Sequence, residues 1–232
     1  NYTYNGTANQ NIGSGFPDNL TGILTINNTG SLNKTVTLDN ARTIANGGSI
    51  VLTAGTFAAG TNLTMSSTSS ISRSAADMTG TIQGSGTYNV TYTGTDKTTS
   101  QELSGSGLNN VTVNVTSAVT LGGSVTVPGT LTFTSGNLSL GSNSLTLGSS
   151  ATVSGAAATK CIVTDGAGGV VRSIANGASF QYPIAPTAGA FNPLTIAVTS
   201  GLTDTYTVRV LSGVNPRRGR RAALKKQPGP EA

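Results

Sequence analysis

The sequence predicts an all-β fold: a parallel β-solenoid (β-helix) of short strands, followed by a C-terminal antiparallel β cap. The first observation is composition, because 64 of the 232 residues are Ser or Thr, 31 are Gly, and only 5% are aromatic. Such proportions are typical of all-β chains with many tight turns. The second observation is an apolar pattern that recurs every six to eight residues, and the third is a repetition of that pattern along the chain.

Two copies of one pattern occupy most of the chain. The segment that begins at Tyr2 (YTYNGT) resembles the segment that begins at Val90 (VTYTGT), at a shift of 88 residues. A repeat of this kind indicates modular or solenoid construction. We therefore expect a first β repeat copy over residues 1–88 and a second copy over residues 89–159.

Each copy contains a finer period, in which two apolar residues flank one Thr or Ser. Alternate side chains of such a unit face one side of a strand, and Gly, Asn or Ser residues between units supply the turns. Three units would form one coil of about 21 residues, and residues 1–158 would form about seven stacked coils. In the second copy the units begin at Val111, Val119, Val125, Leu131, Leu138 and Leu145.

The solenoid has an alternative in two tandem β-sandwich modules, one for each copy. Strands this short, with turns every seven residues, favour the solenoid, because sandwich strands are usually spaced by about 8–12 residues. A narrow prism is also expected to have room only for Val, Ile and Leu, which would explain the scarcity of aromatic residues.

The composition changes near residue 160, and residues 160–212 are predicted to form the cap. The runs Cys161–Asp165 and Gly169–Ile174 flank a Gly-Ala-Gly turn, which predicts a hairpin. Two longer alternating strands are expected over Leu194–Val198 and Tyr206–Leu211. A chemically different terminal unit is expected at a solenoid end, because that end otherwise exposes unpaired backbone and core side chains.

Charge is concentrated in a basic Pro/Gly/Arg-rich tail, residues 213–232. Residues 1–216 carry seven basic and seven acidic side chains, so the body is neutral and the net charge of +5 comes from the tail. We expect the tail to contact an adjacent copy or its own rod. Nucleic acid is not an expected partner, because nothing else in the chain supports phosphate binding. The predicted assembly contacts are Arg217, Arg218, Arg220 and Arg221.

The repeat units resemble those of large, repetitive, secreted cell-surface proteins of Bacteroidota-type bacteria. The segments that carry this resemblance are Tyr2–Gln10, Leu24–Asn28, Gly129–Gly136 and Gly141–Leu147. The segments Val163–Gly166, Val171–Ser173, Phe180–Pro183 and Phe191–Pro193 resemble the block that often follows such repeats. The resemblance implies a β-solenoid or β-sandwich protein that is exported and displayed at the cell surface. The basic tail departs from the C-terminal sorting domain that many such proteins carry.

Few side chains in this sequence are of the kinds that act in catalysis or bind metal ions. The chain has no His and a single Cys, which excludes His-based catalysis, a disulfide framework and a Cys-based zinc site. Asp77 and Asp96 lie about one coil apart, but surface turns explain both. Cys161 is expected to be a small buried residue. The pairs Tyr2 with Tyr4 and Tyr88 with Tyr92 are expected to pack in the core rather than stack on sugars. We expect no catalytic, cofactor-binding or metal-binding residues, and a protein that is not an enzyme.

Glycosylation is a further expectation, because Asn-x-Ser/Thr sequons are more frequent than chance predicts. The chain begins without a secretion signal, which fits a processed product. No apolar run approaches the roughly 18 residues needed to span a membrane. The sequons lie at Asn1, Asn5, Asn19, Asn27, Asn33, Asn62, Asn89, Asn110, Asn114 and Asn137.

Together these features predict an extracellular structural protein, a subunit of a cell-surface filament, layer or stalk. We expect it to assemble with itself through β-strand or solenoid-end contacts, with surface polysaccharide as a second partner. The alternative is an adhesin or glycan-binding surface module that uses rows of Tyr and Asn, with Tyr92 as a contact residue. A polysaccharide-degrading enzyme is a third hypothesis, which requires three or more converging acidic side chains.

Overall fold

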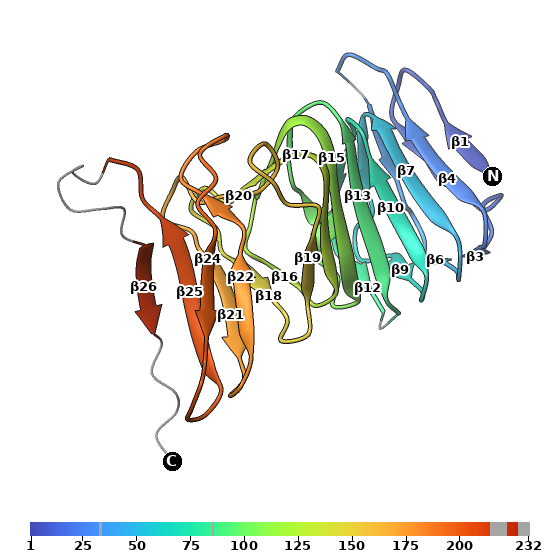
Figure 1. Ribbon diagram of the computed structural model, residues 1–232. Coiled ribbons are helices and arrows are strands. Elements are labelled where there is room, and N and C mark those ends of the chain that lie inside the picture. Colours follow the sequence, from blue (N-terminus) through green and yellow to red (C-terminus); the bar gives the residue numbers. More distant parts are fainter. Residues whose placement is uncertain (33, 85, 214–221, 227–232) are drawn as a thin grey trace.

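The computed structural model describes residues 1–32, 34–84, 86–213 and 222–226, and the regular elements of this part are β-strands apart from one short 3₁₀ helix (Figure 1). Consecutive turns of the chain stack through parallel strand pairs along one long sheet, in the order β1-β4-β7-β10-β13-β15-β17-β20-β23. The predicted parallel β-solenoid is therefore confirmed. The tandem sandwich alternative is wrong, because sandwich modules would pair their strands antiparallel within each copy.

The length of one coil follows from the register of this sheet. Ile50 pairs with Ile71, Ile71 with Val90, Val90 with Val111, and Val111 with Leu131. The steps of 21, 19, 21 and 20 residues agree with the predicted coil. Each coil passes through three faces in chain order, which we call the first, second and third faces.

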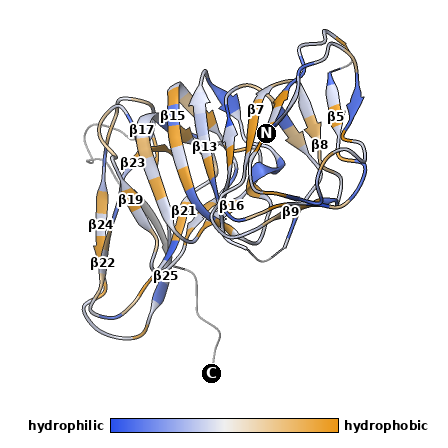
Figure 2. Ribbon diagram, turned by 90° about the vertical axis from the view of Figure 1, so that its right-hand side faces the viewer, coloured by the Kyte–Doolittle hydropathy of each residue, from blue (hydrophilic) through white to orange (hydrophobic). Residues whose placement is uncertain are grey.

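The first face has the longest uninterrupted ladder. Its alternation is regular, since Ile50 and Leu52 are buried while Val51 between them is partly exposed. Figure 2 shows the resulting bands of hydrophobic and paler residues along β13 and β15. The strands are β1 (Tyr2–Tyr4), β4 (Ile23–Asn27), β7 (Ser49–Ala54), β10 (Ser69–Arg73), β13 (Tyr88–Gly94), the first part of β15 (Leu108–Thr120), the first part of β17 (Thr130–Ser139) and β19 (Thr152–Ser154).

The other two faces are built from shorter strands. The second face contains β2 (Gln10–Asn11), β5 (Thr35–Thr37), β8 (Thr56–Ala58), β11 (Asp77–Thr79), β14 (Lys97–Thr98), the last parts of β15 and β17, β20 (Ile162–Val163) and β23 (Ile184–Ala185). The third face contains β3 (Asn19–Leu20), β6 (Arg42–Ile44), β9 (Leu63–Met65), β12 (Ile82–Gln83), the 3₁₀ helix η1 (Gln101–Leu103), β16 (Val125–Val127), β18 (Leu145–Leu147) and β21 (Val170–Ile174).

One apolar core runs through the stack, and it holds more than aliphatic residues. Phe57, Tyr88, Tyr92 and Phe133 are all buried inside the coils. The expectation that only Val, Ile and Leu fit was therefore wrong. The Phe57 ring, for example, lies in register between Val36 of the preceding coil and Met78 of the following coil.

The stack is interrupted at two places. Between the fourth and fifth coils, the second-face ladder stops at β11 and the third-face ladder stops at β12, while β10 and β13 remain paired on the first face. This interruption, which we call the joint, lies close to residue 88, where the first repeat copy was predicted to end. The second interruption is on the first face, after β19.

The C-terminal part departs from the predicted cap. The hairpin expected between Cys161–Asp165 and Gly169–Ile174 is wrong, because β20 pairs in parallel with β17 and β23, and β21 pairs in parallel with β18. The solenoid thus continues beyond residue 160. The driving force is burial, since Ile162 and Ile184 stack in the same core as the coils before them.

Antiparallel strands do close the C-terminal side, as predicted, but they begin later. β22 (Ser179–Tyr182) pairs with β24 (Leu194–Ala197), and β25 (Asp204–Val210) pairs with β21. The backbone of β26 (Ala222–Lys226), in the basic tail, pairs antiparallel with β25. Arg217, Arg218, Arg220 and Arg221 lie outside the described residues, so their assembly contact stays a prediction.

Candidate functional site

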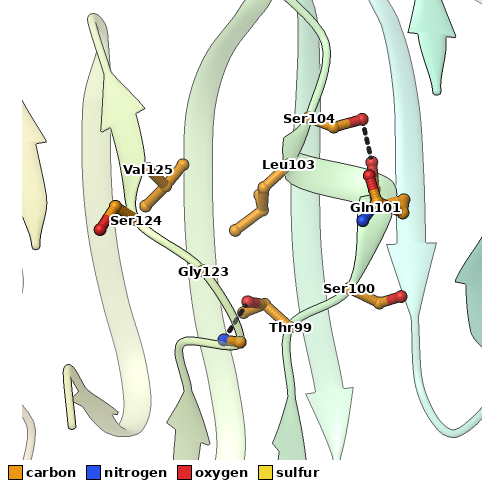
Figure 3. Close-up of a pocket in the computed structure, with 9 residues that line it drawn as sticks. Thr99, Ser100, Gln101, Leu103, Ser104, Gly123, Ser124 and Val125 are labelled. Carbon is orange, nitrogen blue, oxygen red and sulfur yellow. Dashed lines mark hydrogen bonds between the residues drawn. The ribbon is translucent and has the colours of Figure 1, made fainter. Parts of the chain in front are cut away.

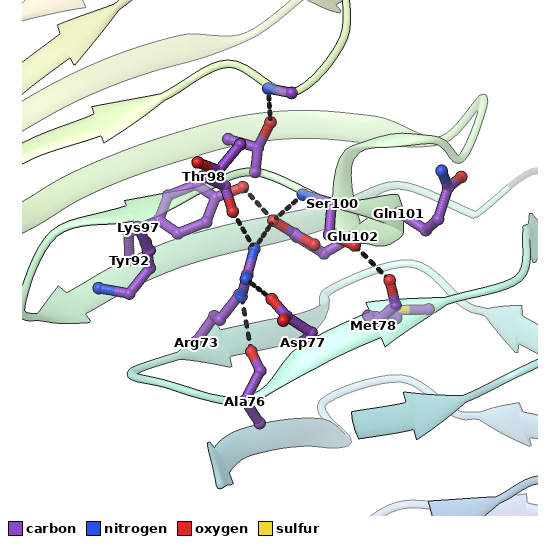
Figure 4. A network of polar contacts seen from close by, with 12 residues as sticks. Arg73, Ala76, Asp77, Met78, Tyr92, Lys97, Thr98, Ser100, Gln101 and Glu102 are labelled. Atoms are coloured by element: carbon purple, nitrogen blue, oxygen red, sulfur yellow. Dashed lines mark hydrogen bonds and ion pairs between the residues drawn. The ribbon is translucent and has the colours of Figure 1, made fainter. Parts of the chain in front are cut away.

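A buried polar network fills the joint (Figure 4). Arg73 is the last residue of β10, and its side chain points inward, leaving the residue 2% exposed. Its Nη1 donates to the Glu102 carboxylate at 2.8 Å and to the Thr98 carbonyl at 2.7 Å, and its Nε donates to the Ala76 carbonyl at 2.6 Å. Nη2 forms an ion pair with Asp77. Arg73 thus joins the fourth coil to the fifth where the second-face ladder is absent.

Glu102 enters the same network from η1, which replaces a strand on the third face. The residue is completely buried. Its Oε1 accepts hydrogen bonds from Arg73, from the Tyr92 hydroxyl at 2.7 Å and from the Ser100 amide at 2.9 Å, while its Oε2 has no partner among the described residues. The Tyr88 hydroxyl donates to the Glu102 carbonyl at 3.1 Å.

The electrostatics of this network indicate a structural role. Burial, with a smaller contribution from the Glu102 charge, raises the pKa of Tyr92 well above its usual value. Burial likewise raises the pKa of Tyr88. Both phenols are therefore neutral hydrogen-bond donors at neutral pH. Arg73 and Glu102 are 2% and 0% exposed, so the centre of the network is closed to solvent and only its Asp77 end reaches the surface; we call this network the polar clamp.

A shallow cavity of about 220 Å³ lies outside this clamp, between η1 and the loop before β16 (Figure 3). Its walls are held by local hydrogen bonds: the Ser104 hydroxyl donates to the Gln101 carbonyl at 2.7 Å, and the Gly122 amide donates to the Thr99 hydroxyl at 2.9 Å. The lining consists of short hydroxyl side chains, backbone, Gln101 and two apolar residues. This chemistry suits a few water molecules or a small neutral polar molecule.

A larger groove of about 590 Å³ lies at the second interruption, between β19 and β22, and we call it the strand slot. Arg172 reaches into it from β21 and is 8% exposed. Its Nη1 donates to the Ala151 carbonyl at 2.7 Å and its Nη2 to the Ser149 carbonyl at 2.7 Å. The guanidinium lies over the Phe180 ring, with Cζ 4.0 Å from the ring centroid. Burial lowers the pKa of Arg172, but an arginine remains charged at neutral pH.

The predicted glycosylation sites fall into distinct environments. Asn137 is buried, its Oδ1 accepts from the Cys161 amide at 3.0 Å and its Nδ2 donates to the Ser117 carbonyl at 3.4 Å. The folded chain therefore does not offer Asn137 for glycan attachment. Asn1, Asn5, Asn19 and Asn114 are exposed, Asn27, Asn62, Asn89 and Asn110 are partly buried, and Asn33 lies outside the described residues.

The two aspartates considered as a pair have separate partners. Asp77 binds Arg73, whereas Asp96 accepts hydrogen bonds from the amides of Ser117 and Ala118, each at 2.9 Å. The hydrogen bond from Ala118 is the main reason why the pKa of Asp96 is lowered. The two carboxylates thus each support local structure.

The predictions for Cys161 and the tyrosines can also be compared with the structure. Cys161 is completely buried, as predicted, and burial raises the pKa of its thiol to about 11. Tyr88 and Tyr92 are buried, which confirms core packing; the alternative use of Tyr92 as a glycan contact is wrong. Tyr4 is partly buried against the core, but the expectation of core packing was wrong for Tyr2, which is 36% exposed and lies 4.9 Å from Phe16, measured between ring centroids.

Sequence reasoning missed three buried arginines, Arg42, Arg73 and Arg172, and the last two illustrate the signal that was present. Arg73 follows Ile71 by two positions, and Arg172 follows Val170 by two positions. Alternation on a strand therefore places both arginines on the inward side. A charged side chain at an inward position predicts either a buried partner of opposite charge or a gap in the wall of the solenoid. Arg73 has the buried partner, Glu102, and Arg172 lies at a gap, the strand slot.

Within residues 1–32, 34–84, 86–213 and 222–226, no group of three or more His, Cys, Asp or Glu side chains lies in a position to hold a metal ion. No helix of that part is long and apolar enough for a membrane crossing. Comparison of the chain with protein families, curated proteins and solved structures gives no match.

Proposed function

We propose that this chain is an extracellular structural protein, a subunit of a cell-surface filament, layer or stalk. The observation that carries the proposal is the first-face ladder, which runs without interruption from β1 to β19. Each of these two outer strands pairs on one side only among the described residues. An unpaired strand edge is a template for pairing with another chain, so a rod with two such edges can assemble through strand contacts.

The surface of the rod supports the same proposal. Outward positions of the ladder carry uncharged polar side chains, such as Thr25, Thr91 and Thr112. Repulsion between neutral surfaces is weak, so rods of this kind can approach closely. The extracellular location rests on the resemblance of the repeats to those of secreted surface proteins. The alternative role, glycan binding through Tyr rows, has lost Tyr92 as a contact residue.

The test is direct imaging of the purified chain. Negative-stain electron microscopy and sedimentation velocity across a hundredfold range of concentration should reveal ordered, concentration-dependent assemblies. Thr3→Lys places a charge on the edge strand β1, where lysine opposes pairing, and should reduce assembly. Thr112→Lys places the same charge on an internal strand and serves as the control. Monomers at every concentration, or equal assembly by both variants, would contradict the proposal.

A further inference from the structure

The strand slot begins with the unpaired edge of β19. Leu131 of β17 pairs with Val153, and the Thr152 amide donates to the Gly129 carbonyl at 3.1 Å, on the β17 side. In a parallel pair, successive residues direct their N–H and C=O groups to opposite edges. Val153 therefore directs its N–H and C=O away from β17 and into the slot, where no strand of the described residues pairs with it.

After β19 the chain continues the second and third faces of the solenoid, but it does not pair a strand with β19 on the first face. On the second face Ile162 pairs with Ile184, and on the third face Leu145 pairs with Val170, so both ladders continue. On the first face β22 pairs with β24 instead of with β19. Figures 1 and 2 both place the β22 and β24 strands next to β19 along the rod. The resulting slot of about 590 Å³ is within the usual size range of ligand sites.

The walls of the slot combine apolar side chains with one positive charge. Val153, Ala156 and Phe180 line it and are each partly exposed. The contacts of Arg172 are two carbonyl oxygens and an aromatic ring, and within the described residues no carboxylate forms an ion pair with it. A largely buried guanidinium gains most from an added carboxylate, because charge-assisted hydrogen bonds are strong in such surroundings.

We propose that the strand slot accepts an extended peptide strand of another chain that carries an acidic side chain. The backbone of the incoming strand pairs with the N–H and C=O of Val153, in the manner of β-strand addition. Its carboxylate binds Arg172, and a neighbouring apolar side chain contacts Phe180.

A peptide fits the slot better than a sugar does. Sugars bind aromatic rings through an open ring face, but Arg172 lies over the Phe180 ring, and the edge-on Tyr182 ring packs at 4.9 Å between centroids. The open groups are instead the backbone N–H and C=O of a strand, which another strand satisfies best. The inference deepens the proposed assembly role and rests on it, since the slot would supply the acceptor side of a strand contact.

The binding test uses a fluorescein-labelled, N-acetylated and C-amidated peptide, Thr-Val-Glu-Val-Thr, titrated with the full chain and followed by fluorescence anisotropy. Two matched peptides are tested alongside it. One carries Lys in place of Glu, and the other is methylated on alternate backbone nitrogens, which removes the donors that a strand pair needs. Each should bind at least about tenfold more weakly, which corresponds to the loss of one strong hydrogen bond.

Two proline variants locate the binding edge. Val153→Pro removes the N–H that points into the slot and leaves the bonds between β19 and β17 in place. Thr126→Pro is the matched control: the amide of Val125 bonds to the Ser144 carbonyl of the β18 side, so the amide of Thr126 points to the unpaired edge of β16. Circular dichroism shows whether both variants are folded. Val153→Pro should lose peptide binding, and Thr126→Pro should bind as the wild type does.

Arg172→Gln tests the charge. This variant should bind the Glu and Lys peptides with equal affinity, while the wild type prefers the Glu peptide. Equal binding of all peptides to the wild type, equal binding by both proline variants, or no saturable binding up to about 1 mM would overturn the inference. So would a uronic acid oligosaccharide that binds the slot in place of peptide. Imaging of assemblies is a separate readout, so failure of the slot and failure of the structural role are distinguishable.

Discussion

The clamp at the joint gives the sharpest test of how this rod is held together. Replacing Glu102 by Ala removes the acceptor that serves Arg73, Tyr92 and Ser100. Arg73 would then keep only Asp77 as an acidic partner, and that carboxylate is 61% exposed. Breaking a buried ion pair by removing one partner costs about 3–5 kcal/mol. We expect Glu102→Ala to lower the free energy of unfolding by an amount in this range.

The assay is urea unfolding followed by circular dichroism, with the midpoint and the slope measured for each variant. Asp39→Asn is the control, because Asp39 is exposed and forms no ion pair among the described residues; such surface substitutions usually change stability by about 0.5 kcal/mol or less. A double variant, Arg73→Met with Glu102→Leu, should be more stable than Glu102→Ala, since it leaves no unpaired buried charge. A loss below about 1 kcal/mol for Glu102→Ala would refute the clamp.

Three further predictions follow from burial and close packing. Cys161 should not react with a thiol reagent at pH 8 in the folded chain and should react fully in urea, because burial raises its pKa to about 11. The free energy of unfolding should fall as the pH rises from 9 to 12, because Cys161 and Tyr182 ionise at lower pH when unfolded than when folded, where burial raises the pKa of Tyr182 to about 12; an unfolding free energy that does not change over this range, measured with urea, would contradict it. Gly168→Ala should destabilise the chain strongly, because the new Cβ would lie 1.9 Å from the Asn143 carbonyl oxygen, whereas Gly123→Ala, with open space around it, should leave the thermal midpoint nearly unchanged.

The solenoid could be predicted from the sequence because its cause is local. An apolar-Thr-apolar unit with a Gly or Asn turn on each side fixes both the face and the length of a strand. The same local reasoning failed at Gly166–Gly168, where a tight turn between two strands predicted a hairpin. A turn does not decide whether its strands pair with each other or with the neighbouring coil. That choice depends on burial of residues such as Ile162 beneath the preceding coil.

The sites were harder to predict because they arise where the repeat fails. The inward position of Arg73 was available from alternation, but its partner Glu102 comes from a short 3₁₀ turn that has no counterpart among the described residues of the other coils. In the same way, Arg172 could be placed inside, but the strand slot exists only because β22 pairs with β24. Non-local pairing of this kind leaves no periodic signal in a single sequence.

The joint has a mechanical consequence. A load along the axis is shared by the backbone bonds of all three faces between most neighbouring coils of the N-terminal half, but between β10 and β13 only one face carries such bonds. Side chains supply the other polar contacts across this level: Arg73 binds Glu102 and the Thr98 carbonyl, and the hydroxyls of Ser100 and Ser106 donate to the carbonyls of Met78 and Gly84. A pulled rod is therefore expected to yield first at this level, bending about the first face, with the Arg73–Glu102 ion pair as the strongest of the side-chain contacts that oppose the opening.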